Sequence, residues 1–339
     1  MPHIHFLATR DNLFAVKQIE TLIPSLAGRM TPIAYDALLR HVSRAYWGCQ
    51  VKESYLAIQR HWSPGRALVR NTGALGVRLF RYLGAPRQPK PGAYIFADLE
   101  RLSPRELQKA AIAWHALSDA GAGIRLLNHP GRSMRRYELL RTLHERGINH
   151  FNAYRLAEAR WPTRYPVFLR REDEHSGAMS PLLRTRGELE AALDGLHRKG
   201  EVRDGLMIVE FCDTADADGI YRKYGAFVVG DRVFASGVQF SRHWVQKRRD
   251  LSEPEMLREQ RLHLEENPHE AALREIFRLA GIDYGRMDYG LLQGKIQVWE
   301  INTNPIITRL PLRQSVERQP IYEHLARNLT EALTLLAPS

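Results

Sequence analysis

Three oxygen-bearing side chains are the residues of this sequence best suited to chemistry. Asp288 and Glu300 lie in two apolar runs, Met287 to Leu292 and Ile296 to Ile301, which have the pattern of β-strands, and Asn302 directly follows the second run. Because side chains on a strand alternate between its faces, Glu300 and Asn302 point the same way. Carboxylates on one face repel each other unless a cation lies between them, and Mg²⁺ prefers such oxygen ligands. The pattern predicts a divalent-cation site; the alternative is a solvated face on which the amide only caps the following turn.

The turn between these two strands decides whether Asp288 joins the other two residues. Directly opposed residues of an antiparallel pair share a face, so Asp288 opposes Glu300 only if the loop has an odd length. The three-residue loop Gln293-Gly294-Lys295 satisfies this condition, with Gly294 in a left-handed conformation. A two-residue loop of Gln293 and Gly294 would instead place Asp288 on the other face.

The elements around this hairpin predict a mixed α/β protein. Tyr165 to Arg170 and Leu206 to Cys212 are strand-like runs. Tyr224 to Val229 and Val233 to Gln239 predict a second hairpin, which turns at Gly230-Asp231. Helices are predicted at Ser133 to Arg146, Arg186 to His197, Ser252 to Arg278 with a break at Pro268, and Ile321 to Leu336.

The first part of the chain, up to about Asn128, predicts an open α/β layer. It begins with a short apolar run, Ile4 to Ala8, and contains a buried strand at Ala93 to Ala97. Helix-like stretches cover Thr31 to Arg44 and Pro104 to Ala120. The second of these has a capping box, in which Ser103 is the cap and Glu106 is the third helical residue. His129-Pro130-Gly131 is a turn and a plausible boundary.

The segment GRMDYGLLQGKIQVWEINTNP, from Gly285 to Pro305, resembles the closing motif of the ATP-grasp superfamily. That superfamily includes D-alanine–D-alanine ligase, glutathione synthetase and the ribosomal-protein glutamate ligases, and the resemblance covers roughly Asn128 to Pro311. It implies that Asp288, Glu300 and Asn302 hold Mg²⁺ on the phosphates of ATP. It also implies that Arg286 contacts the reacting phosphate, as a catalytic residue.

Three segments upstream of this motif occur in the same order along the chain as in that family. Tyr165 to Arg171 resembles the strand that ends in a phosphate-binding cation, here Arg170 (or Arg171) as a catalytic and nucleotide-binding residue. Leu206 to Cys212 resembles the hinge that holds adenine, through Glu210 and backbone groups of Phe211 and Cys212. The helix from Ser133 resembles the one that carries another nucleotide contact, here Arg136.

This sequence departs from the family at both upstream cations, because Arg136 and Arg170 stand where lysines are usual. Arginine keeps the charge and grips phosphate with two donors, but it is not isosteric with an ammonium. The loop expected to cover the phosphates, Arg171 to Ser180, has a single glycine, Gly177; His175 and Ser176 in it are either phosphate contacts or plain surface residues.

Other contacts are left open by the sequence. The candidates for a ribose-binding acid are Asp213, Asp216 and Asp218. Arg222 or Lys223 is expected to face the phosphates, with Lys223 preferred, although either could be an exposed strand charge. Ser241 to Lys247 is either a lining of the substrate side or a surface turn.

We therefore expect an α/β ATP-grasp fold, α+β in its ATP lobes, with an N-terminal open α/β domain at 1–130 and lobes at 131–211 and 212–339. The expected activity is carboxylate–amine ligation through an acyl phosphate, with ATP and two Mg²⁺ (or Mn²⁺) ions. Another ATP-grasp phosphoryl transfer, such as a kinase, and a non-catalytic nucleotide or nucleic-acid binder are the alternatives.

Composition bears on compartment and partners. The net charge of +11 attracts polyanions, but no zinc-finger, RNA-recognition or basic-zipper pattern accompanies it, so we do not expect nucleic acid as a partner. No apolar run reaches the ~20 residues that cross a bilayer, and the start lacks a signal-peptide pattern. With Cys49 and Cys212 as its cysteines, the sequence predicts a reducing, cytoplasmic setting and no disulfide scaffold.

Overall fold

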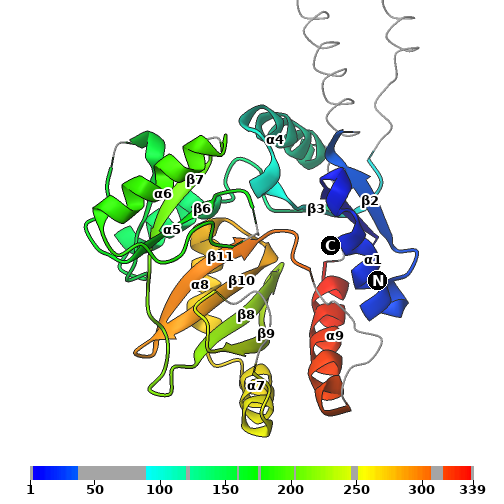
Figure 1. Ribbon diagram of the computed structural model, residues 1–339. Coiled ribbons are helices and arrows are strands. Elements are labelled where there is room, and N and C mark those ends of the chain that lie inside the picture. Colours follow the sequence, from blue (N-terminus) through cyan, green and yellow to red (C-terminus); the bar gives the residue numbers. More distant parts are fainter. Residues whose placement is uncertain are drawn as a thin grey trace, which may run out of the picture.

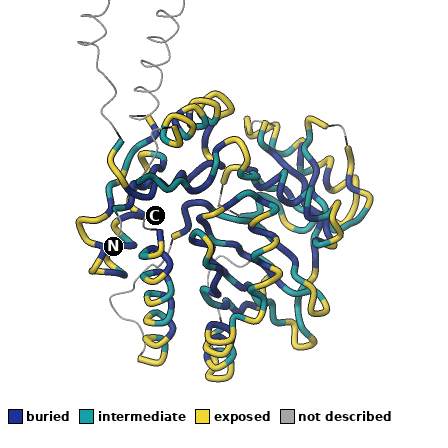
Figure 2. The backbone as a smooth tube through the Cα atoms, turned by 180° about the vertical axis from the view of Figure 1, so that it is seen from behind, coloured by how far each residue is buried: buried dark blue, intermediate teal, exposed yellow. Residues whose placement is uncertain are grey.

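The computed structural model describes residues 3–36, 89–119, 123–158, 160–174, 177–201, 204–245, 251–306 and 316–336. These residues form an α/β protein with one parallel and two antiparallel sheets, as predicted (Figure 1). Figure 2 shows that the sheets are mainly buried, whereas the outer helices alternate between buried and exposed residues.

The first sheet is parallel and has the strand order β2-β1-β3-β4. Its central strands are buried along their whole length, as is usual for a sheet with both faces covered. Ser103 and Glu106 form the predicted capping box at the start of α4, with Ser103 Oγ donating to Glu106 Oε2 at 2.7 Å. The elements are β1 (Ile4–Ala8), α1 (Phe14–Leu22), β2 (Met30–Ala34), β3 (Gly92–Phe96), α4 (Pro104–Asp119) and β4 (Ile124–Leu127).

The helix predicted from Thr31 is wrong over its first part, because Met30–Ala34 is strand β2. It pairs in parallel with β1, so that Thr31 lies beside His5 and Ile33 beside Leu7. The β-branched Thr31 and Ile33 favour a strand, and the edge position tolerates Pro32, which has no N–H to donate. Residues 37–44 of that prediction lie outside the described residues.

The second sheet, in the order β5-β7-β6, separates a helix from the cavity described below. On β6, Val167 and Leu169 pack against α6, whereas Phe168 and Arg170, which alternate with them, line the cavity. This alternation lets one strand serve both a core and a site. The elements are α5 (Arg136–Glu145), β5 (Ala153–Arg155), β6 (Val167–Arg171), α6 (Arg186–Arg198) and β7 (Leu206–Glu210).

The third sheet is antiparallel, in the order β11-β10-β8-β9, and its first hairpin turns at Gly230-Asp231 as predicted. Its last hairpin carries the three predicted cation ligands. The long predicted helix is interrupted near Pro268 as expected, with Asn267 in a left-handed conformation after α7. The elements are β8 (Tyr221–Val229), β9 (Arg232–Ser241), α7 (Pro254–Glu266), α8 (Glu270–Ala280), β10 (Tyr284–Leu292) and β11 (Lys295–Asn302).

The loop of the last hairpin has two residues, Gln293 and Gly294, both with positive φ, so the three-residue loop is wrong. The sequence argument would then place Asp288 on the wrong face. A β-bulge between Asp288 and Tyr289 corrects this, because Trp299 is an extra residue on β11. Beyond the bulge Asp288 lies opposite Glu300, and the two carboxylates share a face.

The helix α9 (Gln319–Thr334) joins the first sheet to the third. Its Leu325, Leu329 and Leu333 lie in one core cluster with β1 and β3 and with Tyr284 and Phe227 of the third sheet. The three sheets fall within 1–130, 131–211 and 212–339, and the division of the chain into domains at these bounds stays a prediction. In the described part of the chain, no helix is long and apolar enough to cross a membrane.

Two histidines, His263 of α7 and His269 at the start of α8, lie together beside the Tyr224 ring. His263 is buried against the Tyr224 ring, and the Tyr289 hydroxyl bonds Nδ1 of His269 at 2.9 Å. Burial, and next the nearby His269, lowers the pKa of His263 to about 4, and burial lowers the pKa of His269 as well.

Acid should therefore destabilise the protein through His263. In the unfolded chain His263 takes up a proton near pH 6.5, whereas in the folded chain its pKa is about 4. The contribution of His263 to stability is therefore intact above pH 6.5 and declines as the pH falls towards 4. We expect His263 alone to lower the free energy of unfolding by about 2 kcal/mol at pH 5. Urea unfolding at pH 7 and pH 5 measures it, and His263→Gln should show a shallower pH dependence. Equal slopes in the two proteins would contradict the assignment.

Candidate functional site

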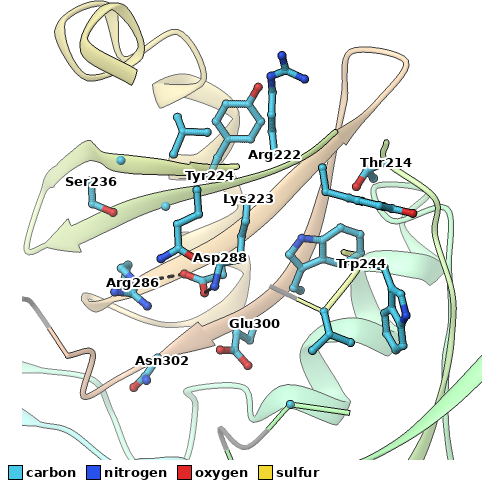
Figure 3. A pocket seen from close by; sticks show the side chains of 18 of the residues that line it. Thr214, Arg222, Lys223, Tyr224, Ser236, Trp244, Arg286, Asp288, Glu300 and Asn302 are labelled. Carbon is cyan, nitrogen blue, oxygen red and sulfur yellow. Dashed lines mark hydrogen bonds and ion pairs between the residues drawn. The ribbon is translucent and has the colours of Figure 1, made fainter. Parts of the chain in front are cut away.

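A cavity of about 920 Å³ lies between the second and third sheets and collects almost all of the predicted site residues. Figure 3 shows Lys223, Arg286, Asp288 and Glu300 close together on the strands of the third sheet. Of the predicted residues, those that line the cavity are Arg170, Glu210, Phe211, Cys212, Lys223, Arg286, Asp288, Glu300 and Asn302. Arg136 is not among the lining residues.

One face of the third sheet changes along its length from apolar to polar. At the end near the first sheet, Tyr284 of β10 faces the shared core together with Phe227 of β8. Two and four residues further along β10, Arg286 and Asp288 occupy the same face and line the cavity. Packing in this core cluster therefore holds β8 and β10 in place, and neighbouring residues on the same two strands form the site.

Asp288 is buried and ion paired with two cations. Its Oδ2 accepts a hydrogen bond from Nζ of Lys223 at 3.0 Å, and its Oδ1 accepts one from Nε of Arg286 at 3.1 Å. Burial alone would raise the pKa of Asp288, but the positive charges of Arg286 and Lys223 hold it below its ordinary value. Asp288 is therefore ionised at neutral pH.

Glu300 is held by two arginines, Arg136 of α5 and Arg170 of β6. Its Oε2 accepts from Arg136 at 2.6 Å and from Arg170 at 3.0 Å. Burial, and next the charge of Arg136, lowers the pKa of Arg170 to about 10, so Arg170 is still protonated at neutral pH. Charge-assisted bonds of this kind fix the position of the carboxylate relative to the second sheet.

Arg136 connects this carboxylate to the segment that follows β6. Its side chain is 4% exposed, and Nη1 donates to the carbonyl oxygens of Arg171, Glu172 and Glu174 at 3.0, 2.7 and 2.7 Å. The sequence resemblance implied a nucleotide contact for Arg136. The structure gives its guanidinium protein partners on both sides, which is the arrangement of a residue that positions other groups.

The donor set suits a hard divalent cation. Asp288 and Glu300 are directly opposed on β10 and β11, and the next pair along the same face is Arg286 and Asn302. Mg²⁺ is commonly bound by one or two carboxylates together with phosphate oxygens and waters. Among the described residues no group of three or more His, Cys, Asp and Glu is placed to hold a metal, so Asn302, phosphate oxygens or waters would have to complete this site.

The predicted hinge residues Glu210, Phe211 and Cys212 all line the cavity. The carboxylate of Glu210 faces the other way, since it accepts hydrogen bonds from the Tyr154 hydroxyl at 2.9 Å and the Asn152 N–H at 3.0 Å. The N–H of Phe211 donates to the Pro166 carbonyl. Cys212 is buried, and burial raises the pKa of its thiol to about 11, so it is neutral at physiological pH.

Aromatic rings form the end of the cavity near the hinge. The Trp244 ring lies 5.0 Å from Phe168 and 5.7 Å from Phe211, measured between ring centroids. Trp299, the bulge residue of β11, lies 5.1 Å from Phe151 and also lines the cavity. The sequence had placed Ser241 to Lys247 on the substrate side or on the surface; Trp244 instead lies at the hinge, and residues 246–247 are outside the described part.

The acids proposed for ribose do not line the cavity. Asp213 and Asp218 are exposed, and Asp216 is ion paired with Arg222 at 2.5 Å. Thr214, between these acids, lines the cavity, and sequence reasoning missed it. A threonine in a loop carries no signal that would have singled it out.

The structure places the members of the two pairs of alternative cations differently. Arg170 faces the cavity, whereas Arg171 turns outward to Glu201 at 2.5 Å. Arg222 borders the cavity but is held by Glu259 at 2.8 Å and by Asp216. In the loop after β6, Gly177 lines the cavity, and His175 and Ser176 lie outside the described residues.

Solved structures have a fold similar to that of this chain. The D-alanine–D-alanine ligase from Coxiella burnetii matches over 99% of this chain and 95% of its own, with a TM-score of 0.51 and 14% identity. This chain has the ATP-grasp fold. The ATP-grasp fold confirms the predicted class, with an open parallel α/β sheet followed by two antiparallel ones.

Two further structures are similar at lower TM-scores. They are the ATP complex of D-alanine–D-alanine ligase from Bacillus anthracis (0.47, 12% identity, 99% of this chain and 98% of that one) and an L-amino acid ligase from Bacillus licheniformis (0.46, 11% identity, 98% and 74%). No protein-family model and no curated sequence matches the chain. The resemblance to the ATP-grasp fold is thus one of structure and of a few motif residues.

Proposed function

We propose that this protein is an ATP-dependent ligase that joins a carboxylate to an amine or a related nucleophile through an acyl phosphate. One observation carries the proposal: Asp288 and Glu300 are directly opposed in a cavity that also presents Arg170, Lys223 and Arg286. Cations and carboxylates gathered in this way suit a nucleotide triphosphate with its divalent cation. The ATP-grasp fold is consistent with this use.

The aromatic end of the cavity is the proposed nucleobase site. The rings of Phe168, Trp244 and Trp299 offer apolar surface to adenine, and backbone groups of Phe211 and Cys212 would meet the base edge. Lys223, Arg170 and Arg286 would then hold the phosphates. Asp288, Glu300 and Asn302 would hold Mg²⁺, which supplies charge neutralisation on the phosphates when bound.

The proposed reaction has two steps. A substrate carboxylate attacks the terminal phosphorus of ATP, which forms an acyl phosphate and releases ADP. The amine then attacks the acyl carbon, and inorganic phosphate leaves as the C–N bond forms. Arg286 and Arg170 would stabilise the negative charge on the transferring oxygens, since fixed cations aimed at developing charge lower the barrier.

The experiment is a turnover screen of the full chain with Mg-ATP and pools of carboxylic acids and amino acids. We expect equimolar ADP and phosphate when both a carboxylate and an amine are present, and a product whose mass is that of the two less water. ADP without phosphate, together with a stable phosphorylated product, would favour the kinase-like alternative. Failure of ATP to bind would remove the proposal altogether.

Arg170→Lys should reduce activity moderately. Lysine keeps the positive charge but loses the planar fork, and its ammonium reaches fewer oxygens. We expect kcat/KM to fall roughly tenfold. Arg171→Lys is the matched control, because Arg171 binds Glu201 away from the cavity and its change should leave turnover unaltered. A loss in Arg171→Lys as large as that in Arg170→Lys would contradict the role given to Arg170.

A further inference from the structure

The polar end of the cavity is positively charged before any ligand is considered. Among the described residues, the lining residues Arg170, Lys223 and Arg286 and the neighbouring Arg136 form ion pairs with two carboxylates, Asp288 and Glu300. The cluster therefore has an excess of two positive charges. A polyanion is attracted to such a cluster, and a lone divalent cation is repelled by it.

Each carboxylate is already engaged by two cations in a buried setting. Arg136 and Arg170 both reach Oε2 of Glu300, and Lys223 and Arg286 reach the two oxygens of Asp288. The side chains of Asp288 and Glu300 are 9% and 17% exposed, so solvent screens these pairs weakly. A divalent cation could coordinate both carboxylates fully only after some of these arginine and lysine side chains bind another anion instead.

Two other charged residues of the cavity lining, Arg222 and Glu210, have partners outside this cluster. Arg222 is paired with Asp216 and Glu259, and Glu210 has Arg164 beside it at 3.5 Å. Neither of these groups draws on the four cations of the cluster.

We propose that the cavity binds the polyphosphate chain first and that the bound phosphates then recruit the divalent cation. The phosphates draw Lys223, Arg286 and Arg170 away from Asp288 and Glu300, which releases the carboxylate oxygens for the cation. The proposal rests on the function proposed above and adds the order in which its ligands bind. It also predicts that, in the absence of metal, the site binds a polyphosphate that carries no divalent cation.

The test is equilibrium binding to the full chain, with no turnover required. Tripolyphosphate in the presence of EDTA should bind the wild type and weaken with added salt, whereas Mn²⁺ alone should show no stoichiometric binding by electron paramagnetic resonance. Glu300→Gln and Asp288→Asn should each bind metal-free tripolyphosphate more tightly, by roughly tenfold, because each variant removes a competing negative charge. Glu331→Gln, in an exposed pair with Arg232, is the control and should match the wild type.

Two results would overturn the proposal. Stoichiometric binding of Mn²⁺ alone that Glu300→Gln abolishes would mean that the carboxylates take the cation first. Unchanged or weaker binding of metal-free tripolyphosphate by both variants would mean that the carboxylates do not compete with phosphate. Tight binding of tripolyphosphate without any ATP turnover would contradict the proposed ligase and leave this inference standing, so the two failures are distinguishable.

Discussion

Glu300→Gln should lose nearly all ATP turnover while the protein still folds. Glutamine has the size of glutamate and keeps an oxygen that accepts from Arg136 and Arg170, so the ion pairs become ordinary hydrogen bonds. It lacks the negative charge that a hard cation needs. We expect kcat to fall on the order of a hundredfold or more, with the circular dichroism spectrum unchanged.

ADP release under saturating Mg-ATP and substrate is the measurement for this variant, and Glu331→Gln provides the matched loss of one carboxylate far from the cavity. Near-normal ADP release by Glu300→Gln would remove Glu300 from the cation site. The interpretation of the hairpin as a metal centre would then have to be abandoned.

Arg136→Ala should cost both stability and activity, which separates a positioning role from a nucleotide contact. The substitution leaves Glu300 without one of its cations and removes the donor to the carbonyls of Arg171, Glu172 and Glu174. Removal of one partner of a buried ion pair costs about 3–5 kcal/mol. We therefore expect a clear fall in the thermal unfolding midpoint together with loss of turnover.

Arg136→Lys refines this prediction, because an ammonium cannot bridge Glu300 and the carbonyls as a fork does. It should lower kcat more than it raises the KM for ATP. Arg141→Ala on the same helix removes surface contacts with Glu145 and Glu158 and should leave the unfolding midpoint close to that of the wild type. A normal unfolding midpoint in Arg136→Ala, with only the KM for ATP raised, would restore the direct nucleotide contact that the sequence implied.

The sequence was informative wherever local patterning decides the structure. The capping box of Ser103 and Glu106, the hairpin at Gly230 and the break near Pro268 are all confirmed. The strand β2 was missed because a short edge strand containing Pro32 has no clear period of its own and is stabilised by pairing with β1.

The site shows the same limit at the level of single residues. Asp288 and Glu300 do share a face, but through the bulge at Trp299, which no residue type in the strand announces. Arg136 could be recognised as a cation near the site, yet its three carbonyl partners come from the end of β6 and the residues after it, more than thirty positions away in sequence. Trp244 lies at the hinge because it packs against Phe168 and Phe211, and only the tertiary fold creates these contacts.

The helix α9 has a consequence for how the chain is made. Its leucines complete the core under β1 and β3, although some two hundred residues of other elements are synthesised between β3 and α9. During translation an apolar face of the first sheet therefore stays exposed until α9 has been synthesised. Chaperones that shield nascent apolar surface should bind that face, and chains that stop before residue 319 should aggregate rather than accumulate as a folded N-terminal piece.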